Sequence, residues 1–172
     1  MELTDLLSED QWYAFEQDIH DRFGMDTNVF NTDGFRITTF KSWVNHLCPE
    51  IKATDKGQSF ICAVAHMNLA VIGQNTKEPV VEECDAGLVK IVVPIFVNGT
   101  FLGALGACGF LLDDGEVDAF LVNKITEIEE DTVEELSRNI PCISSEKAEK
   151  LIAYVQARLQ DIITSYKNQS GS

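Results

Sequence analysis

The chain has 172 residues, of which 45% are hydrophobic and 24% charged, a composition that excludes an intrinsically disordered protein and suits a single globular domain. Its formal net charge of −15 argues against direct binding to nucleic acids or to anionic membranes, because both require a basic surface. No apolar stretch is long enough to span a bilayer, and the N-terminus lacks the basic and apolar segments of a signal peptide, so we expect a cytoplasmic protein.

The first predicted element is a helix over residues 8–23. The sequence Ser8-Glu9-Asp10-Gln11 has the S-x-x-Q form of a capping box, in which two side chains bond to each other's backbone. Apolar residues then recur at helical spacing from Trp12 to Phe23, and Gly24 ends the pattern in the manner of a C-terminal cap.

A hairpin is predicted next, over residues 26–39, because strand-forming residues alternate on both sides of the turn-forming segment 31–34. Apolar residues at helical spacing then predict a helix from Thr39 to Cys48, which Pro49 ends. The polar residues between Pro49 and Gln58 predict a loop.

The middle of the chain predicts one buried helix and three strands. Residues 59–73 are apolar on nearly every side of a helix, which is typical of a helix covered all round. Strands are predicted at about 80–84, 88–97 and 101–111, with the hairpin turn Asn98-Gly99 between the last two. These central strands are apolar on both faces, so we expect both sides of the sheet to be covered.

Helices are predicted again at about 115–137 and 145–167, separated by the break at Ile140-Pro141. We expect one domain over residues 1–168 and a flexible tail over residues 169–172. Because strands and helices do not alternate along the chain, a parallel doubly wound fold is disfavoured. The order predicts an α+β fold with a central antiparallel sheet of about five strands and helices on both faces.

Three segments are similar, in order, to those of a known family. "LSEDQWYAFEQDIHDRFGMDTNVFNTDGFRIT" resembles an opening helix, a strand, an Asp-Gly turn and a second strand. "CDAGLVKIVVPIFVNGTFLGALGACG" resembles a core of Cys-x-x-Gly-Leu, Pro-Ile and Leu-Gly steps, and "IPCISSEKAEKLIAYVQARLQDII" resembles the closing segment. Over about residues 4–165 the chain resembles the PocR-type sensory domain, a relative of the PAS and GAF ligand-binding folds.

The resemblance implies a PAS/GAF-like sensor that binds a small molecule between its sheet and its helices. It also implies a downstream signalling protein or module that receives the signal. One position departs from the family pattern, because Cys108-Gly109 stands where the family often has Gly-Gln. A ligand contact by that glutamine therefore does not carry over to this chain.

The cysteines leave three interpretations open: buried core residues, metal ligands, or redox thiols. Cys48, Cys62 and Cys84 are the candidate metal ligands, and the resemblance places Cys48 and Cys62 where the family carries spaced cysteines. His66 lies one helical turn after Cys62 and would complete a Cys₃His zinc set, whereas Cys108 as fourth ligand would suit an iron–sulfur cluster. The spacings match no compact metal motif, so the thiols would have to converge in space.

Several side chains are candidates for a ligand pocket, because such pockets are mostly apolar with a few polar groups. The apolar candidates are Phe40, Trp43, Phe60, Met67, Phe96 and Phe110. The polar candidates are Asn28, Arg36, Asp85 and Lys90.

We expect no enzymatic activity, because the chain has no G-x-S-x-G, H-E-x-x-H, P-loop or Rossmann motif. Three functions remain: a sensor of an organic ligand, a metal or iron–sulfur redox sensor, and a non-catalytic interaction or adaptor domain. Signalling would use shifts of the first and last helices. The apolar stripe from Ala148 to Tyr166 is the candidate surface for a homodimer, unless it covers the sheet.

Overall fold

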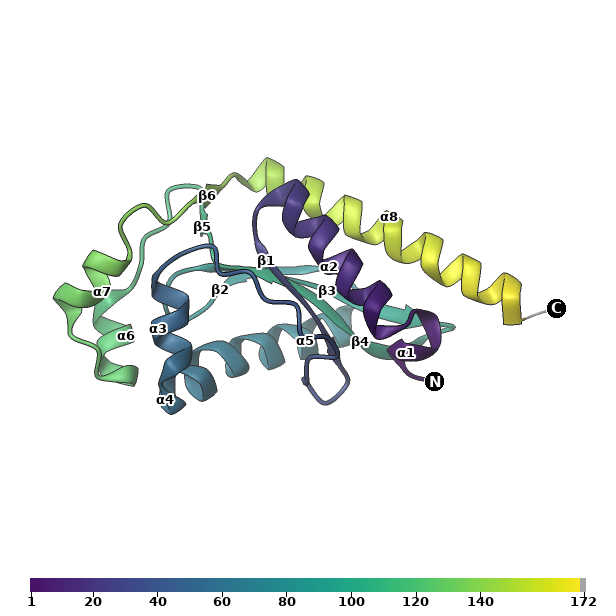
Figure 1. Cartoon of the computed structure of the whole chain (residues 1–172), viewed down its shortest axis with the longest axis horizontal. Helices are drawn as coiled ribbons and strands as arrows, with labels where there is room; N and C mark the ends of the chain where they lie inside the picture. The colour runs from purple at the N-terminus through teal and green to yellow at the C-terminus, as the bar shows by residue number, and fades with distance from the viewer. Residues whose placement is uncertain (171–172) are drawn as a thin grey trace.

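A computed structural model describes residues 1–170 and places helices on both sides of one central sheet (Figure 1). The elements in chain order are α1 (Leu3–Leu6), α2 (Glu9–Phe23), β1 (Asp26–Asn31), α3 (Leu47–Ala53), α4 (Asp55–Gly57), the π-helix η1 (Gln58–Ala63), α5 (Val64–Thr76), β2 (Val80–Glu83), β3 (Val89–Val97), β4 (Thr100–Cys108), β5 (Leu111–Leu112), α6 (Ala119–Thr126), α7 (Glu130–Leu136), β6 (Cys142–Ile143) and α8 (Ser145–Ser170). The architecture is α+β, as the order of elements predicted.

The central sheet has four strands in the order β1-β4-β3-β2, and every neighbouring pair is antiparallel. Strands β3 and β4, the two central strands, form a hairpin that turns at Asn98-Gly99. The strongest turn signal in the sequence therefore connects the two central strands of the sheet. The short strands β5 and β6 form a separate parallel pair. The expectation of an antiparallel sheet with about five strands is confirmed.

The two faces of the sheet carry different coverings. Helices α2 and α8 lie on one face, and α5 crosses the other face, as Figure 1 shows. On β3 and β4, Ile91, Val93 and Leu105 point into the large apolar core beneath α2 and α8. The residues that alternate with these along the strands, such as Lys90 and Cys108, belong to the face beneath α5.

Helix α2 forms as predicted. Ser8 accepts a hydrogen bond from the Gln11 backbone, and the Gln11 side chain accepts one from the Ser8 backbone at 2.9 Å. Gly24 ends the helix in the left-handed conformation. Trp12 is fully buried, and its indole N–H donates to the Leu3 carbonyl at 2.9 Å, which fastens α1 to α2.

The predicted hairpin over residues 26–39 is wrong in its second half. The turn after Asn31 forms, but beyond it only Arg36 makes an isolated bridge, to Phe30. Strand β1 pairs with β4 along its other edge, from Asp26 opposite Cys108 to Asn31 opposite Gly103. The segment after the turn keeps backbone hydrogen bonds to β1, such as that from the Ile37 N–H to the Val29 carbonyl at 3.1 Å, but it does not form a strand.

The predicted helix from Thr39 to Cys48 is also wrong. That segment is irregular, and α3 begins at Leu47, so Pro49 lies in the first turn of a helix rather than after its end. Proline suits this position, because the first-turn N–H groups have no partner within the helix and the ring already fixes a helical φ. Residues 50–58, predicted as a loop, form the rest of α3, α4 and the start of η1.

The helix predicted over residues 59–73 exists as η1 followed by α5, but its predicted burial is wrong. Only one side packs against the sheet, through His66, Leu69 and Gly73. The outer side leaves large apolar residues exposed: Phe60, Val64, Met67, Val71 and Ile72. The sequence pattern misled because an apolar helix is not covered unless another element lies over it.

The single helix predicted over 115–137 is two helices, α6 and α7, because Glu127 adopts a positive φ that ends α6. The final helix is confirmed and runs to Ser170, beyond the predicted end at residue 167. Of the predicted tail, residues 171–172 lie outside the described residues. Among the described residues, none of the helices has both the length and the apolar character needed to cross a membrane.

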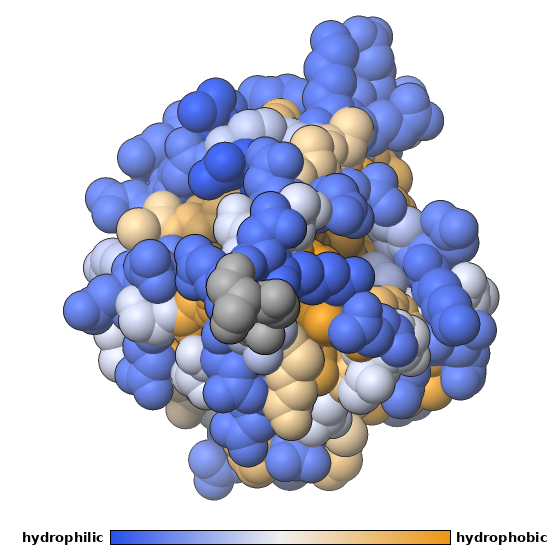
Figure 2. All heavy atoms as spheres, turned by 90° about the vertical axis from the view of Figure 1, so that its right-hand side faces the viewer, coloured by the Kyte–Doolittle hydropathy of each residue, from blue (hydrophilic) through white to orange (hydrophobic). Residues whose placement is uncertain are grey.

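The apolar stripe of α8 covers the sheet over its first half, where Ala148, Leu151 and Val155 are buried in the core. Its last turns extend past the sheet toward the C-terminus (Figure 1). The end of the molecule seen in Figure 2 is mostly hydrophilic, with apolar atoms showing only between the polar side chains.

Candidate functional site

A cavity of about 560 Å³ lies on the α5 face of the sheet. Strands β1, β3 and β4 form its floor, η1 and α5 form one wall, α3 forms another, and residues 33–36 and 43–44 cover it. Its volume falls within the range of about 300–1,000 Å³ that is typical of small-molecule pockets. The sheet thus separates this cavity from the close-packed core on its opposite face.

One row of residues crosses the floor of the cavity. Asp26, Cys108 and Lys90 are neighbours across β1, β4 and β3, in that order, and all three line the cavity. Asp26 and Lys90 are both buried, with 4% and 7% of their surface exposed. A buried charge is costly without a partner, so this row is the first sign of a site rather than of a core.

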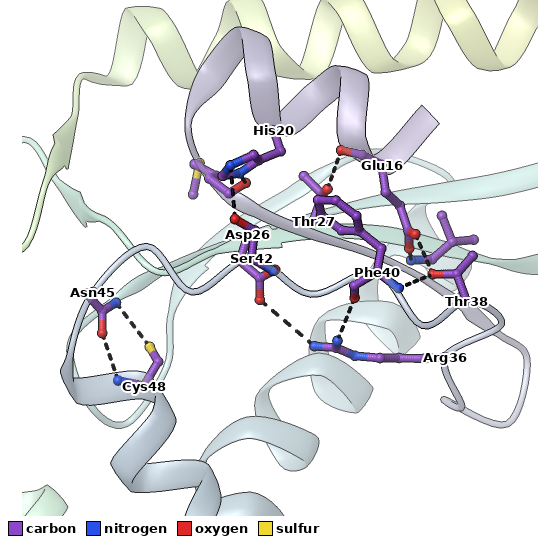
Figure 3. A network of polar contacts seen from close by, with 12 residues as sticks. Glu16, His20, Asp26, Thr27, Arg36, Thr38, Phe40, Ser42, Asn45 and Cys48 are labelled. Carbon is purple, nitrogen blue, oxygen red and sulfur yellow. Dashed lines mark hydrogen bonds and ion pairs between the residues drawn. The ribbon is translucent and has the colours of Figure 1, made fainter. Parts of the chain in front are cut away.

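The loop that covers the cavity is fastened to α2 and β1 by polar contacts (Figure 3). Arg36 lies 4.0 Å from the Asp26 carboxylate and donates to the Phe40 carbonyl at 3.3 Å. The Asp26 carboxylate also accepts from the Ser42 backbone at 3.2 Å, and the Ser42 hydroxyl bonds to His20 at 3.0 Å. These contacts hold an irregular segment in one conformation over the cavity.

Asn45 fixes the far end of this loop. Its side chain accepts from the Cys48 backbone N–H in the first turn of α3 at 2.7 Å and donates to the Gly109 carbonyl at 2.7 Å. Gly109 has a φ of +101°, and a Cβ atom there would lie 2.4 Å from Val44. Glycine is therefore required where β4 ends against the loop, and this contact sets the position of Cys48 in the cavity wall.

Four cysteines, Cys48, Cys62, Cys84 and Cys108, line the cavity, although they come from four separate segments of the chain. Burial raises the thiol pKa of Cys48 and Cys62, and it raises the thiol pKa of Cys84 to about 11. These three thiols are therefore protonated at neutral pH. Cys142, the fifth cysteine, is exposed.

The side chains around the cavity do not fit a single metal ion. Within residues 1–170, no three His, Cys, Asp or Glu side chains converge closely enough to hold one. A zinc site of Cys48, Cys62, Cys84 and His66 would need them at common bonding distance from one point. The sequence required the thiols to converge for a metal site. They line one cavity, but the described side chains form no group of three close enough to hold a zinc ion.

His66 and Asn28 are buried polar residues with unpaired atoms. His66 is 3% exposed and stacks on the Phe30 ring with 3.5 Å between ring centroids, and its Nδ1 has no hydrogen-bond partner. Asn28 is 1% exposed, and neither atom of its amide has a partner. Burial, together with the charges of Lys90 and Arg36, lowers the pKa of His66 to about 3, so the imidazole is neutral at physiological pH.

The predicted pocket residues separate into two groups. Trp43 and Met67 line the cavity, at the cover and on α5. The other four lie elsewhere: Phe40 packs edge-on against Tyr13, Phe60 is 60% exposed, Phe96 packs against Phe101, and Phe110 belongs to the core near Gly24. Of the predicted polar contacts, Arg36 and Lys90 line the cavity, whereas Asp85 is exposed and Asn28 lies at the edge of the floor.

Sequence reasoning missed Asp26, Phe30, Asn45 and Lys52. The first two follow a detectable pattern, since Asp26, Asn28 and Phe30 occupy alternate positions of β1 and so share the cavity face. The polar character of Asp26 and Asn28 within a buried strand was a usable signal of a polar floor, and Phe30 shares their face by alternation. Lys52 and Asn45 gave no such signal, because their roles depend on where α3 begins.

The family model described as a sensory domain found in PocR matches residues 5–166 of the chain. The match includes both coverings of the sheet, the cavity and all four thiols that line it. No curated protein and no solved structure matches the chain.

Proposed function

The chain belongs to the family of sensory domains found in PocR, and on that premise we propose that it detects a small organic molecule bound in the cavity beneath α5. The observation that carries the proposal is the pairing of an unfilled volume of about 560 Å³ with buried polar atoms that lack partners. Buried polar groups are normally hydrogen-bonded in native proteins. Unpaired atoms beside a cavity therefore mark groups that a ligand satisfies.

The cavity lining favours a ligand with a substantial apolar part. Phe30, Trp43 and Leu88 supply apolar surface, and the protonated thiols add soft, weakly polar surface. The charged lining residues are Asp26 and Lys90 on the sheet floor, Lys52 on α3, and Asp33 and Arg36 in the covering loop. A lining with both apolar and charged side chains suits a molecule with an apolar part and a polar part.

We further propose that the terminal helix transmits the signal. Helix α8 contacts β3, the strand whose cavity side carries Lys90, and it also contacts α2. The Tyr154 hydroxyl on α8 donates to the Asp18 carboxylate on α2. A ligand that moves β3 thus acts on α8 through one layer of packed side chains, and a downstream protein or module would receive the movement.

Analysis of the retained ligand tests the proposal. The whole chain is purified and denatured, and the extract is examined by mass spectrometry. Ala63→Trp fills the cavity from η1, whereas Ala157→Trp adds the same bulk on the exposed side of α8. We expect one small molecule in near-stoichiometric amount from the wild type and from Ala157→Trp, and none from folded Ala63→Trp. Equal amounts from all three, or none from any, would contradict a ligand in this cavity.

A second proposal keeps Cys48, Cys62, Cys84 and Cys108 as ligands of an iron–sulfur cluster. The specific observation in its favour is that all four thiols line one cavity. The raised thiol pKa values and the absence of a tight cluster among the described residues weigh against it. Protein purified without oxygen should be brown and contain iron and sulfide under this proposal. A colourless, iron-free preparation would eliminate it.

The third function, an interaction domain with an empty core, makes the opposite prediction on both tests. It requires that no ligand is recovered and that filling the cavity leaves partner binding unchanged. We rank it below the sensor, because an empty cavity would leave Asn28 and His66 without compensation for their buried polar atoms.

A further inference from the structure

Cationic side chains are concentrated in the cavity of a strongly acidic protein. The chain has a formal net charge of −15, yet Arg36, Lys52 and Lys90 all line this one cavity. They come from the covering loop, from α3 and from β3. All three act on His66, because each is a cause of its lowered pKa. The inside of the cavity thus has the opposite sign to the surface around it.

The cations are only partly neutralised. Arg36 faces Asp26 at 4.0 Å, which accounts for one positive and one negative charge. Lys52 and Lys90 form no ion pair with any described carboxylate, and each lies over an aromatic ring. The remaining acidic residue of the lining, Asp33, is exposed at the cavity mouth.

Lys90 is the most unusual of the three. It is 7% exposed, and its Nζ lies 5.7 Å from the centre of the Phe30 ring. A cation over an aromatic face gains less than it would from a carboxylate. Burying an ammonium group without an anion is unfavourable, so the fold holds Lys90 in a position that an anionic ligand would relieve.

Lys52 is subject to the same positive electrostatic environment as Lys90. Burial lowers its pKa first, and the positive charges of Arg36 and Lys90 lower it further. Lys52 and Lys90 both line the cavity, so their positive charges repel each other across it. One negative group between them would offset the repulsion and the desolvation of both.

Neutral polar groups lie at the other end of the floor. Gly106 stands opposite Asn28 across β1 and β4, and a Cβ there would lie 3.1 Å from the Asn28 Oδ1 and 3.7 Å from the His66 Nδ1. Because Gly106 has no side chain, Asn28 and His66, whose buried polar atoms have no partner, pack closely over it. Because His66 is neutral, this end suits an uncharged donor or acceptor rather than a second anionic group.

We propose that the ligand is a small organic carboxylate, with its anionic group at Lys52 and Lys90 and its apolar part against Phe30 and Trp43. This inference rests on the proposed function, because it names the class of molecule that the sensor cavity takes. Bidentate recognition by Arg36 is not required, since that side chain is already committed to Asp26 and the Phe40 carbonyl.

The test compares acids with their uncharged counterparts. Butyrate, hexanoate and benzoate are titrated into the whole chain by calorimetry at constant ionic strength, beside butyramide, hexanamide and benzamide. We expect at least one acid to bind while its amide does not. The same binding should become roughly tenfold to a hundredfold weaker in Lys90→Met and in Lys52→Met, because a charge-assisted contact is lost. Lys147→Met, which removes an exposed lysine on α8, should bind as the wild type does.

Failure of this inference differs from failure of the sensor proposal. Amides that bind as tightly as acids, or acid binding that survives in folded Lys90→Met and Lys52→Met, would overturn the carboxylate and leave a sensor of neutral molecules. If none of the six compounds binds, the extract of denatured protein decides. A retained organic acid supports the carboxylate proposal. A retained neutral molecule overturns the carboxylate but leaves the sensor proposal standing, and an extract without any ligand overturns both.

Discussion

The two faces of the sheet differ in what fills the space beneath their helices. On the face covered by α2 and α8, a continuous apolar core leaves few polar atoms, and the buried Glu16 is satisfied by two hydrogen bonds. On the face covered by α3, η1 and α5, smaller apolar clusters surround a cavity lined by two lysines without an ion pair to any described carboxylate, by thiols and by an unpaired imidazole. One face is filled by the largest core, and the other also holds groups that need a further partner.

This difference follows from the alternation of side chains along the strands. Leu105 and Ala107 on β4 point toward α8, whereas Gly106 and Cys108 point toward α5. A single strand thus contributes apolar residues, among them the large Leu105, to the packed layer and small residues to the other. Small residues on one side of a strand leave the volume that a ligand can occupy.

Truncation of one residue on each face gives the sharpest contrast. Leu105→Ala should lower the free energy of unfolding by about 2–5 kcal/mol, because its neighbours in the packed core cannot close the hole. Cys108→Ala, three residues along the same strand, should cost less than about 1 kcal/mol, because its side chain already borders open volume. Urea unfolding of both variants measures the difference. Equal losses would mean that the cavity side is packed as tightly as the core.

The second prediction concerns Glu16, the carboxyl buried on the packed face. Burial raises its pKa to about 7, although the Thr38 hydroxyl and the Val29 N–H, at 2.6 Å, oppose the shift. A carboxyl whose pKa is raised on folding stabilises the fold fully below its ordinary pKa of 4.5, and this contribution is lost as pH rises through 7. Relative to Glu16→Gln, the wild type should lose on the order of 3 kcal/mol of stability between pH 4.5 and 7.

The measurement for Glu16 is the free energy of unfolding across that pH range for both proteins. Glu149→Gln, at an exposed position of α8, serves as control and should follow the wild type. A wild-type curve parallel to that of Glu16→Gln would show that the carboxyl titrates normally.

The packed face was the more predictable of the two. The capping box at Ser8, the left-handed cap at Gly24 and the Asn98-Gly99 turn are local signals, and each produced the expected boundary. The failures occurred where a local pattern competed with distant partners. Pro49 marks a helix start rather than an end only because Asn45 bonds to Gly109, at the end of a strand far along the chain.

The cavity lining was predictable only in part. Cys48, Cys62, Cys84 and Cys108 stood out because cysteine is rare and chemically distinct, and all four line the cavity. Lys90 was named as a candidate polar contact and Lys52 was not, since sequence alone does not show that a lysine lacks a carboxylate partner. Phe40, Phe60, Phe96 and Phe110 were misassigned because an aromatic residue fits a core as well as a pocket.

A third prediction tests whether the cavity face sacrifices stability for its ligand. Lys90→Met should raise the free energy of unfolding of the ligand-free protein by up to about 1 kcal/mol, because it replaces an unpaired buried ammonium by an apolar side chain of similar length. Lys147→Met should change nothing, since that lysine is exposed on α8. Urea unfolding after removal of bound small molecules is the measurement. A destabilised Lys90→Met would indicate that the ammonium supports the fold itself.

The smallest expected effect is on reaction rates alone and leaves stability unchanged. Cys142 is exposed and should react with a thiol reagent in a single fast phase at pH 8. Cys84 should react on the order of 100-fold more slowly, because a pKa raised from 9.0 to about 11 leaves correspondingly less thiolate, and Cys48 should be slower still because burial raises its pKa further. Cys142→Ser should remove the fast phase and leave the slow ones. A second fast phase in that variant would mean that solvent readily reaches a cavity thiol. The ligand-free protein would then combine a closed core on one face of the sheet with an accessible site on the other.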